Sequence, residues 1–207
     1  MQVLSKNRDL LWKFVLNPIY GPISVIIGLI GDFASYLLYP GYNVLSNMVS
    51  DLGTGPGGIY FNIGIFLSGI FALFLYIHFG IKIKNFNINN KIRKFGMIMA
   101  TISCITFSMI GIFPSYKDIQ LLFIIHGTFA LISWISGSIY ISIFSFFSLK
   151  LKRIPNYMGI VGFIVNFLII IFIFTWIPLV EWLMTLGIIF WVLVIYFSVK
   201  HIKKYYN

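Results

Sequence analysis

Six long apolar segments constrain this chain more than any other feature of its sequence. Each is long enough, at about 1.5 Å of rise per residue, to cross the roughly 30 Å hydrocarbon layer of a bilayer as an α-helix. Hydrophobic residues make up 59% of the 207 residues and charged residues 10%, against roughly 45–50% and about 25% in a soluble domain. Lipid must therefore be the solvent for most of the chain. The expected spans are residues 20–38, 59–81, 95–113, 121–148, 157–177 and 182–199.

These segments are expected to be helices, because backbone N–H and C=O groups have no water partner inside the hydrocarbon layer. A membrane β-barrel would alternate polar and apolar residues along each strand, and these segments do not alternate. The predicted fold class is therefore all-α, with residues 1–207 forming one integral membrane bundle of six transmembrane helices. The single cysteine, Cys104, excludes an intrachain disulfide framework.

Basic residues predict how the bundle is oriented. With six spans, every Lys and Arg except Lys117 falls on one side of the membrane. The positive-inside rule assigns this side to the cytoplasm, so both termini are expected there in a multi-pass protein of the cell membrane. The net charge of +10 then reflects topology and contact with membrane lipids, and nucleic acid is not expected as a partner. Protein partners are left open. Residues 1–16 are typical of a basic, partly amphipathic segment at the membrane surface.

The connection after the first span is the least apolar long stretch, and it holds Asp51, one of only five carboxylates in the chain. Ser46 lies in the same loop, which is expected on the outer side. Its apolar residues recur at steps of three and four and predict a short interfacial helix that ends near Gly53 and folds back into the bundle mouth. These residues are Val44, Leu45, Met48, Val49 and Leu52.

Two ionisable residues fall inside the predicted spans near their outer ends. Asp32 shares a helical stripe with small and polar residues that should face other helices; the members of this stripe are Ser24, Gly28, Gly31 and Ser35. Asp32 is either a site residue or a packing hydrogen bond. His126 is either a general base or metal ligand, or a hydrogen-bonded core histidine.

Counting helix rise places Asp32, Asp51, Asn62 and His126 in one outer layer about 10 Å thick. Their convergence would make an outward-opening polar pocket. The candidates for catalysis are Asp51, His126 and Asp32, those for substrate binding are Ser46 and Asn62, and those for a metal are Asp51 and His126. The sequence assigns no cofactor.

Two functions fit these residues. The preferred hypothesis is a non-enzymatic lipid-binding or regulatory bundle with a polar pocket on its outer side. The alternative is a membrane-embedded hydrolase or transferase that acts on a lipid or isoprenoid-linked substrate from the outer leaflet. Membrane hydrolases that bind a metal use several histidines, whereas this chain has one on the relevant side. Whether the chain is an enzyme is left open.

Two stretches carry a resemblance to a known family. The first runs through Ser50-Asp51-Leu52-Gly53 to Asn62, and the second through Pro114 to His126. Together they resemble domain of unknown function 998, a family of uncharacterised six-helix membrane proteins. The outer loop is also similar to the Frag1/DRAM/Sfk1 group of six-span proteins. The resemblance implies a six-helix membrane fold and no particular activity.

Overall fold

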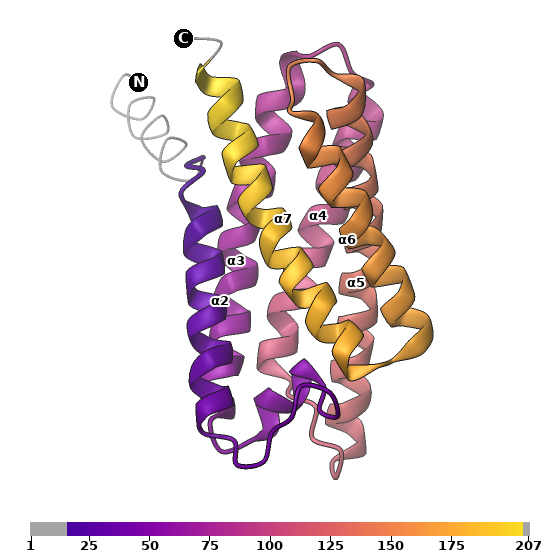
Figure 1. The fold of residues 1–207 in the computed structure, drawn as a ribbon. Helices are drawn as coiled ribbons and strands as arrows, with labels where there is room; N and C mark the ends of the chain where they lie inside the picture. Colours follow the sequence, from indigo (N-terminus) through magenta and orange to yellow (C-terminus); the bar gives the residue numbers. More distant parts are fainter. Residues whose placement is uncertain (1–15, 205–207) are drawn as a thin grey trace, which may run out of the picture.

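The computed structural model describes residues 16–204, so the segment predicted over 1–16 lies almost wholly outside the described residues (Figure 1). Within that range the chain is all-helical, and six of its helices are long and apolar enough to cross a membrane. They are α2 (Tyr20–Leu37), α3 (Gly58–Lys82), α4 (Asn90–Ile112), α5 (Gln120–Lys150), α6 (Asn156–Thr175) and α7 (Pro178–Lys204). Two short 3-10 helices, η1 (Val49–Thr54) and η2 (Ile83–Asn85), lie in the connections after α2 and α3. The six-helix membrane fold expected from the apolar segments is therefore confirmed.

Two helices begin earlier than the apolar segments indicate. Helix α4 begins at Asn90 because the Asn89 side chain accepts hydrogen bonds from the amides of Lys91 and Ile92 at 2.9 and 3.3 Å, and so caps the first turn. Helix α7 begins at Pro178, whose missing N–H is no loss in the first turn of a helix. Charged residues expected in connections consequently lie in first turns.

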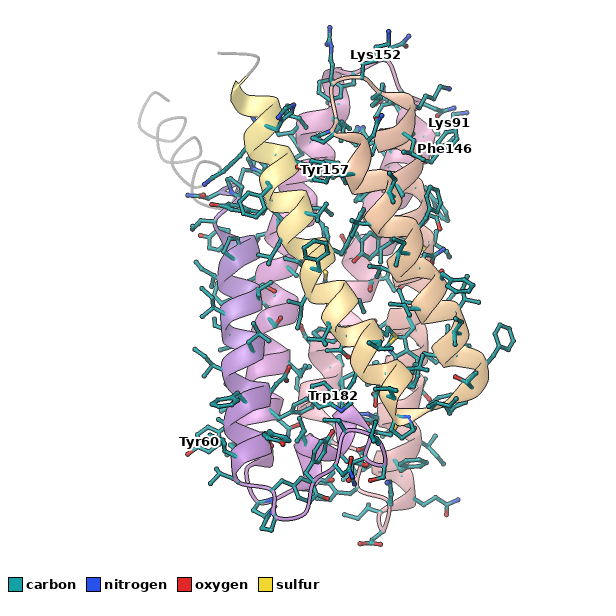
Figure 2. All side chains as sticks on the ribbon, viewed as in Figure 1. Tyr60, Lys91, Phe146, Lys152, Tyr157 and Trp182 are labelled. Atoms are coloured by element: carbon teal, nitrogen blue, oxygen red, sulfur yellow. The ribbon has the colours of Figure 1, made fainter. Side chains whose placement is uncertain are left out.

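The helices pack against one another in sequence order, and α7 closes the bundle by also contacting α2 and α3. Figure 1 shows α7 crossing the bundle diagonally, close to α2 and α3 at the top and to α5 and α6 lower down. We call the end with connections 38–57, 113–119 and 176–177 the loop end. The opposite end, where Figure 2 labels Lys91 and Lys152, is the basic end.

Small residues bring α2 close to α3. A Cβ atom added to Gly31 would lie 2.7 Å from the carbonyl oxygen of Tyr60 and 3.0 Å from the Cα of Gly64. About two turns toward the basic end, the Ser24 hydroxyl donates to the Ser68 carbonyl at 2.9 Å. The predicted stripe of α2 does face another helix, because all four of its small residues and Asp32 are buried.

Polar residues in mid-span join other helix pairs. The Ser103 hydroxyl of α4 donates to the Ser133 carbonyl of α5 at 2.9 Å, and the Ser133 hydroxyl donates back to the Ser103 carbonyl at 3.1 Å. Asn166 of α6 bonds to Ser138 and donates to the Ser142 hydroxyl of α5 at 2.9 Å. These bonds satisfy polar groups that lipid could not.

Candidate functional site

The connection 38–57 folds back over the loop end of the bundle and is bonded to two helices. The Ser35 hydroxyl of α2 donates to the Leu52 carbonyl at 2.8 Å. The Asn62 side-chain amide of α3 donates to the Gly53 carbonyl at 3.0 Å. Leu52 is fully buried, while Leu45 stays 64% exposed. Only the second half of the predicted short helix is present, as the 3-10 helix η1, which buries Val49 and Leu52 at the mouth of the bundle; Val44 and Leu45 precede it and are exposed.

Gly53 is required by this close approach. A Cβ atom there would lie 2.6 Å from the Asn62 side-chain oxygen and 3.0 Å from the ring of Phe61. Asn62 therefore holds η1 against α3 through the Gly53 carbonyl. Its side-chain oxygen is buried without a hydrogen-bond partner.

The Asp51 carboxylate is bonded within the loop end. One oxygen forms an ion pair with the Lys117 ammonium at 2.9 Å, and the other accepts the Met48 amide at 3.0 Å. The Asp51 amide donates to the Met48 carbonyl at 3.1 Å, which completes a reciprocal pair at the start of η1. Ser46 is exposed, and its hydroxyl bonds only weakly within the loop, to the Asn43 carbonyl at 3.4 Å.

A Tyr–Trp pair ties the loop to α7. The Tyr42 hydroxyl donates to the Met48 carbonyl at 2.7 Å and accepts the indole N–H of Trp182 at 3.1 Å. The Tyr42 and Trp182 rings meet edge to face with centroids 6.2 Å apart. Figure 2 shows Trp182 beside the loop, at the loop end of α7.

The pKa of the Tyr42 hydroxyl depends on its burial and on the charges around it. Burial raises its pKa above the ordinary value for tyrosine, and the Trp182 hydrogen bond opposes that rise in part. The negative charges of three carboxylates, those of Glu181, Asp51 and Asp32, raise the same pKa further. Three of the five carboxylates in the chain therefore act electrostatically on one hydroxyl at the loop end.

Glu181 is a buried residue of this region that the sequence analysis did not select. It lies in the first turn of α7, is 6% exposed, and accepts the Val49 amide at 2.6 Å. The Glu181 carboxylate thus accepts a backbone N–H at the start of η1 that has no partner within that helix. In an ordinary N-cap, a side chain at the start of the same helix accepts this N–H. The sequence does carry one signal for this role of Glu181, because a carboxylate three residues after Pro178 is typical of the first turn of a helix.

His126 and Asp32 have different surroundings. The His126 Nδ1 atom lies 2.8 Å from the Phe113 carbonyl oxygen. Because a carbonyl can only accept, Nδ1 carries the proton and Nε2 is the ring's remaining acceptor when the imidazole is neutral. Asp32 is 8% exposed, and its Oδ1 atom is buried without a hydrogen-bond partner.

Asp32, His126 and Glu181 line one cavity in the centre of the bundle. Its walls come from all six spanning helices, α6 contributing only Ile169, with Val49 and Ser50 of η1 at the loop end. The cavity has a volume of about 130 Å³ and is partly open at its surface. Of the predicted site residues, Asp32 and His126 lie on this wall. Asp51, Asn62 and Ser46 do not, and they bond instead within or beneath the loop.

The cavity wall is apolar over most of its length. Phe, Ile, Val, Ala and Met side chains dominate it, and the serine pairs that reach it, Ser24 with Ser68 and Ser103 with Ser133, are bonded to each other. In residues 16–204, no three His, Cys, Asp or Glu side chains converge into a group that could hold a metal ion. The arrangement is suited to an apolar chain with a polar head at the loop end.

Comparison with known proteins gives one match. The family described as "Protein of unknown function (DUF998)" matches residues 22–199, which cover all six spanning helices except the ends of the first and last. No curated protein and no solved structure matches the chain. Similarity to the Frag1/DRAM/Sfk1 group is not shown.

Proposed function

We propose that this chain, which belongs to the DUF998 family of multi-pass membrane proteins of unknown function, is a non-enzymatic lipid-binding bundle. The apolar part of the lipid occupies the central cavity, and its head lies at the loop end beside Asp32, His126 and Glu181. The observation that supports this best is the cavity itself, which is apolar along its walls and carries these three polar side chains at one end.

The route of entry is between α2 and α7. Both helices contribute to the cavity wall, α2 through Ser24 to Asp32 and α7 through Glu181 to Val192. Figure 1 shows the two helices diverging toward the loop end as α7 crosses the bundle. Entry along this proposed route would take a lipid sideways from the surrounding bilayer, without passing through water.

The loop end is proposed to face the outside of the cell membrane, with both termini in the cytoplasm. Among the described residues, Lys117 is the one basic side chain of the loop end, and the others belong to the basic end or its connections. The positive-inside rule then places the head of the bound lipid at the level of the outer leaflet.

The test is to fill the cavity and measure bound lipid. Ala72 and Ala130 are buried on the cavity wall, so Ala72→Phe and Ala130→Phe should exclude the chain. Ile63→Phe is the matched control, because Ile63 is 52% exposed and outside the cavity. Native mass spectrometry of protein released from nonionic detergent should show lipid on the wild type and on Ile63→Phe.

The two cavity-filling variants should show little or none, while thermal unfolding in detergent confirms that they remain folded. Equal lipid occupancy in folded wild-type and cavity-filled protein would overturn the proposal. If purified protein converted a lipid supplied to it into products, that result would favour the alternative, a hydrolase or transferase at the same site.

A further inference from the structure

We infer that the lipid held in this cavity carries a primary ammonium group, and that Asp32 is its counter-charge, with Glu181 and His126 beside it. The inference rests on the proposed lipid binding and specifies the chemistry of the head. The ammonium belongs either to a long-chain amine or to an ethanolamine headgroup.

The first step of the argument is the unpartnered oxygen of Asp32. The residue is 8% exposed, it lines the cavity, and its Oδ1 atom has no hydrogen-bond partner. A buried carboxyl oxygen that bonds to nothing is destabilising, and a donor brought in by a ligand removes that cost. The tight contact at Gly31 fixes the neighbouring backbone of α2 against α3.

The second step is the charge balance of the cavity. Two carboxylates, those of Asp32 and Glu181, are part of its wall, and no Lys or Arg is among the described residues that line it. The cation of the loop end, Lys117, is 67% exposed and pairs with Asp51 outside the cavity. A cationic head would stabilise the ionised form of these two buried carboxyls, whereas a phosphate head without an ammonium would oppose their ionisation.

The third step is the number and type of hydrogen-bonding atoms. A primary ammonium has three N–H donors and no acceptor. The cavity wall offers the carboxyl groups of Asp32 and Glu181 and, with the Nδ1 proton donated to Phe113, His126 Nε2. Three acceptor groups at one end of an apolar cavity match that head better than they match a hydroxyl, which has one donor.

The experiment compares oleylamine with oleyl alcohol, which have the same chain and differ in the head. Binding of each to purified protein in nonionic detergent is measured by native mass spectrometry. Wild-type protein should prefer the amine by about tenfold or more, the effect of a charged hydrogen bond. Asp32→Asn keeps the shape of the side chain and should reduce this preference by about tenfold. Both ligands partition into the same micelles. Comparing the ratio of amine binding to alcohol binding between variants therefore cancels any difference in partitioning between the two ligands.

Asp118→Asn is the matched control, because this carboxylate is exposed and outside the cavity, and its preference should equal that of the wild type. Binding of oleyl alcohol to Asp32→Asn shows that the variant is folded. Equal binding of the two ligands to the wild type, or an unchanged preference in Asp32→Asn, overturns the inference and leaves lipid binding standing. If neither ligand binds, the proposed function fails as well.

A second comparison identifies the source of the ammonium. Dioleoylphosphatidylethanolamine competing with oleylamine while dioleoylphosphatidylglycerol does not would assign the site to an ethanolamine headgroup. Failure of both phospholipids to compete would assign it to a long-chain amine. Competition by dioleoylphosphatidylglycerol alone would overturn the inference, because an anionic head would then be preferred.

Discussion

The contact between α2 and α3 predicts that Gly31→Ala destabilises the bundle although alanine favours helices. The added Cβ would lie 2.7 Å from the Tyr60 carbonyl oxygen and 3.0 Å from the Gly64 Cα. Both of these atoms belong to the backbone of α3, so no side chain can rotate away. The two helices must move apart, and every neighbouring contact along the pair loosens with them.

The magnitude follows from two opposing terms. Overpacking of a close-packed contact costs about 1–3 kcal/mol, and a clash with backbone belongs in the upper part of that range. Replacing glycine by alanine within a helix returns about 0.8–1 kcal/mol through propensity. The net loss expected for Gly31→Ala is therefore about 1–2 kcal/mol.

Two other glycines separate the cost of overpacking from the gain in helix propensity. Gly127 lies within α5, and a Cβ atom there would meet nothing within 4 Å, so Gly127→Ala should be neutral or stabilising. At Gly28 the nearest atom is the Ser68 Oγ at 3.4 Å, an ordinary contact, so Gly28→Ala should fall between the other two. The three variants share the same chemical change and differ in the space available.

The assay is reversible unfolding in mixed micelles by increasing fractions of sodium dodecyl sulfate, followed by far-UV circular dichroism and tryptophan fluorescence. The order of stability expected is Gly127→Ala, then Gly28→Ala, then Gly31→Ala, with about 2–3 kcal/mol between the extremes. Gly31→Ala as stable as Gly127→Ala would refute the reasoning, because it would mean that α2 and α3 do not meet at that distance.

Three further predictions concern the loop end. Ser35→Ala should cost about 1–2 kcal/mol in the same assay because it removes a buried 2.8 Å bond to η1, whereas Ser46→Ala, at an exposed hydroxyl, should cost almost nothing; equal losses would contradict the fold-back of the loop. Lys117→Met should cost at most about 1 kcal/mol, since the lysine is 67% exposed, and the difference from wild type should shrink in 1 M salt; a larger, salt-independent loss would show that the pair is not a surface contact. In a cysteine-free background, Thr54→Cys should react with an impermeant thiol reagent in intact cells and Asn87→Cys only after permeabilisation; the reverse pattern would exclude the proposed orientation.

The fold could be predicted from the sequence because a chain in lipid must satisfy its backbone hydrogen bonds internally. Continuous apolar runs of spanning length must be helices, and the small residues around Asp32 indicated which face of α2 would pack. Helix ends were less predictable where capping decided them: Asn89 and Pro178 each start a helix before its apolar run begins.

The site was harder to predict, because helix rise gives the depth of a residue but not the direction of its side chain. Depth alone grouped Asp32, His126 and Asp51, whereas helix rotation puts the first two on the cavity wall and Asp51 beside Lys117. Glu181 was missed because its partner is the backbone amide of Val49. A peptide N–H has no signature in the sequence, and the two residues are far apart along the chain.

The bond between Glu181 and Val49 has a consequence for how the protein is made. It joins residues 132 positions apart, so during synthesis the Val49 amide has no partner until the sixth span leaves the ribosome. Five helices can already be in the membrane at that stage, with the first amide of η1 uncapped and the centre of the bundle still open to lipid. Insertion of the last helix supplies one wall of the cavity and the cap that closes its end together. Assembly is therefore completed by the last helix to be made, and the cavity is not closed before that helix is in place.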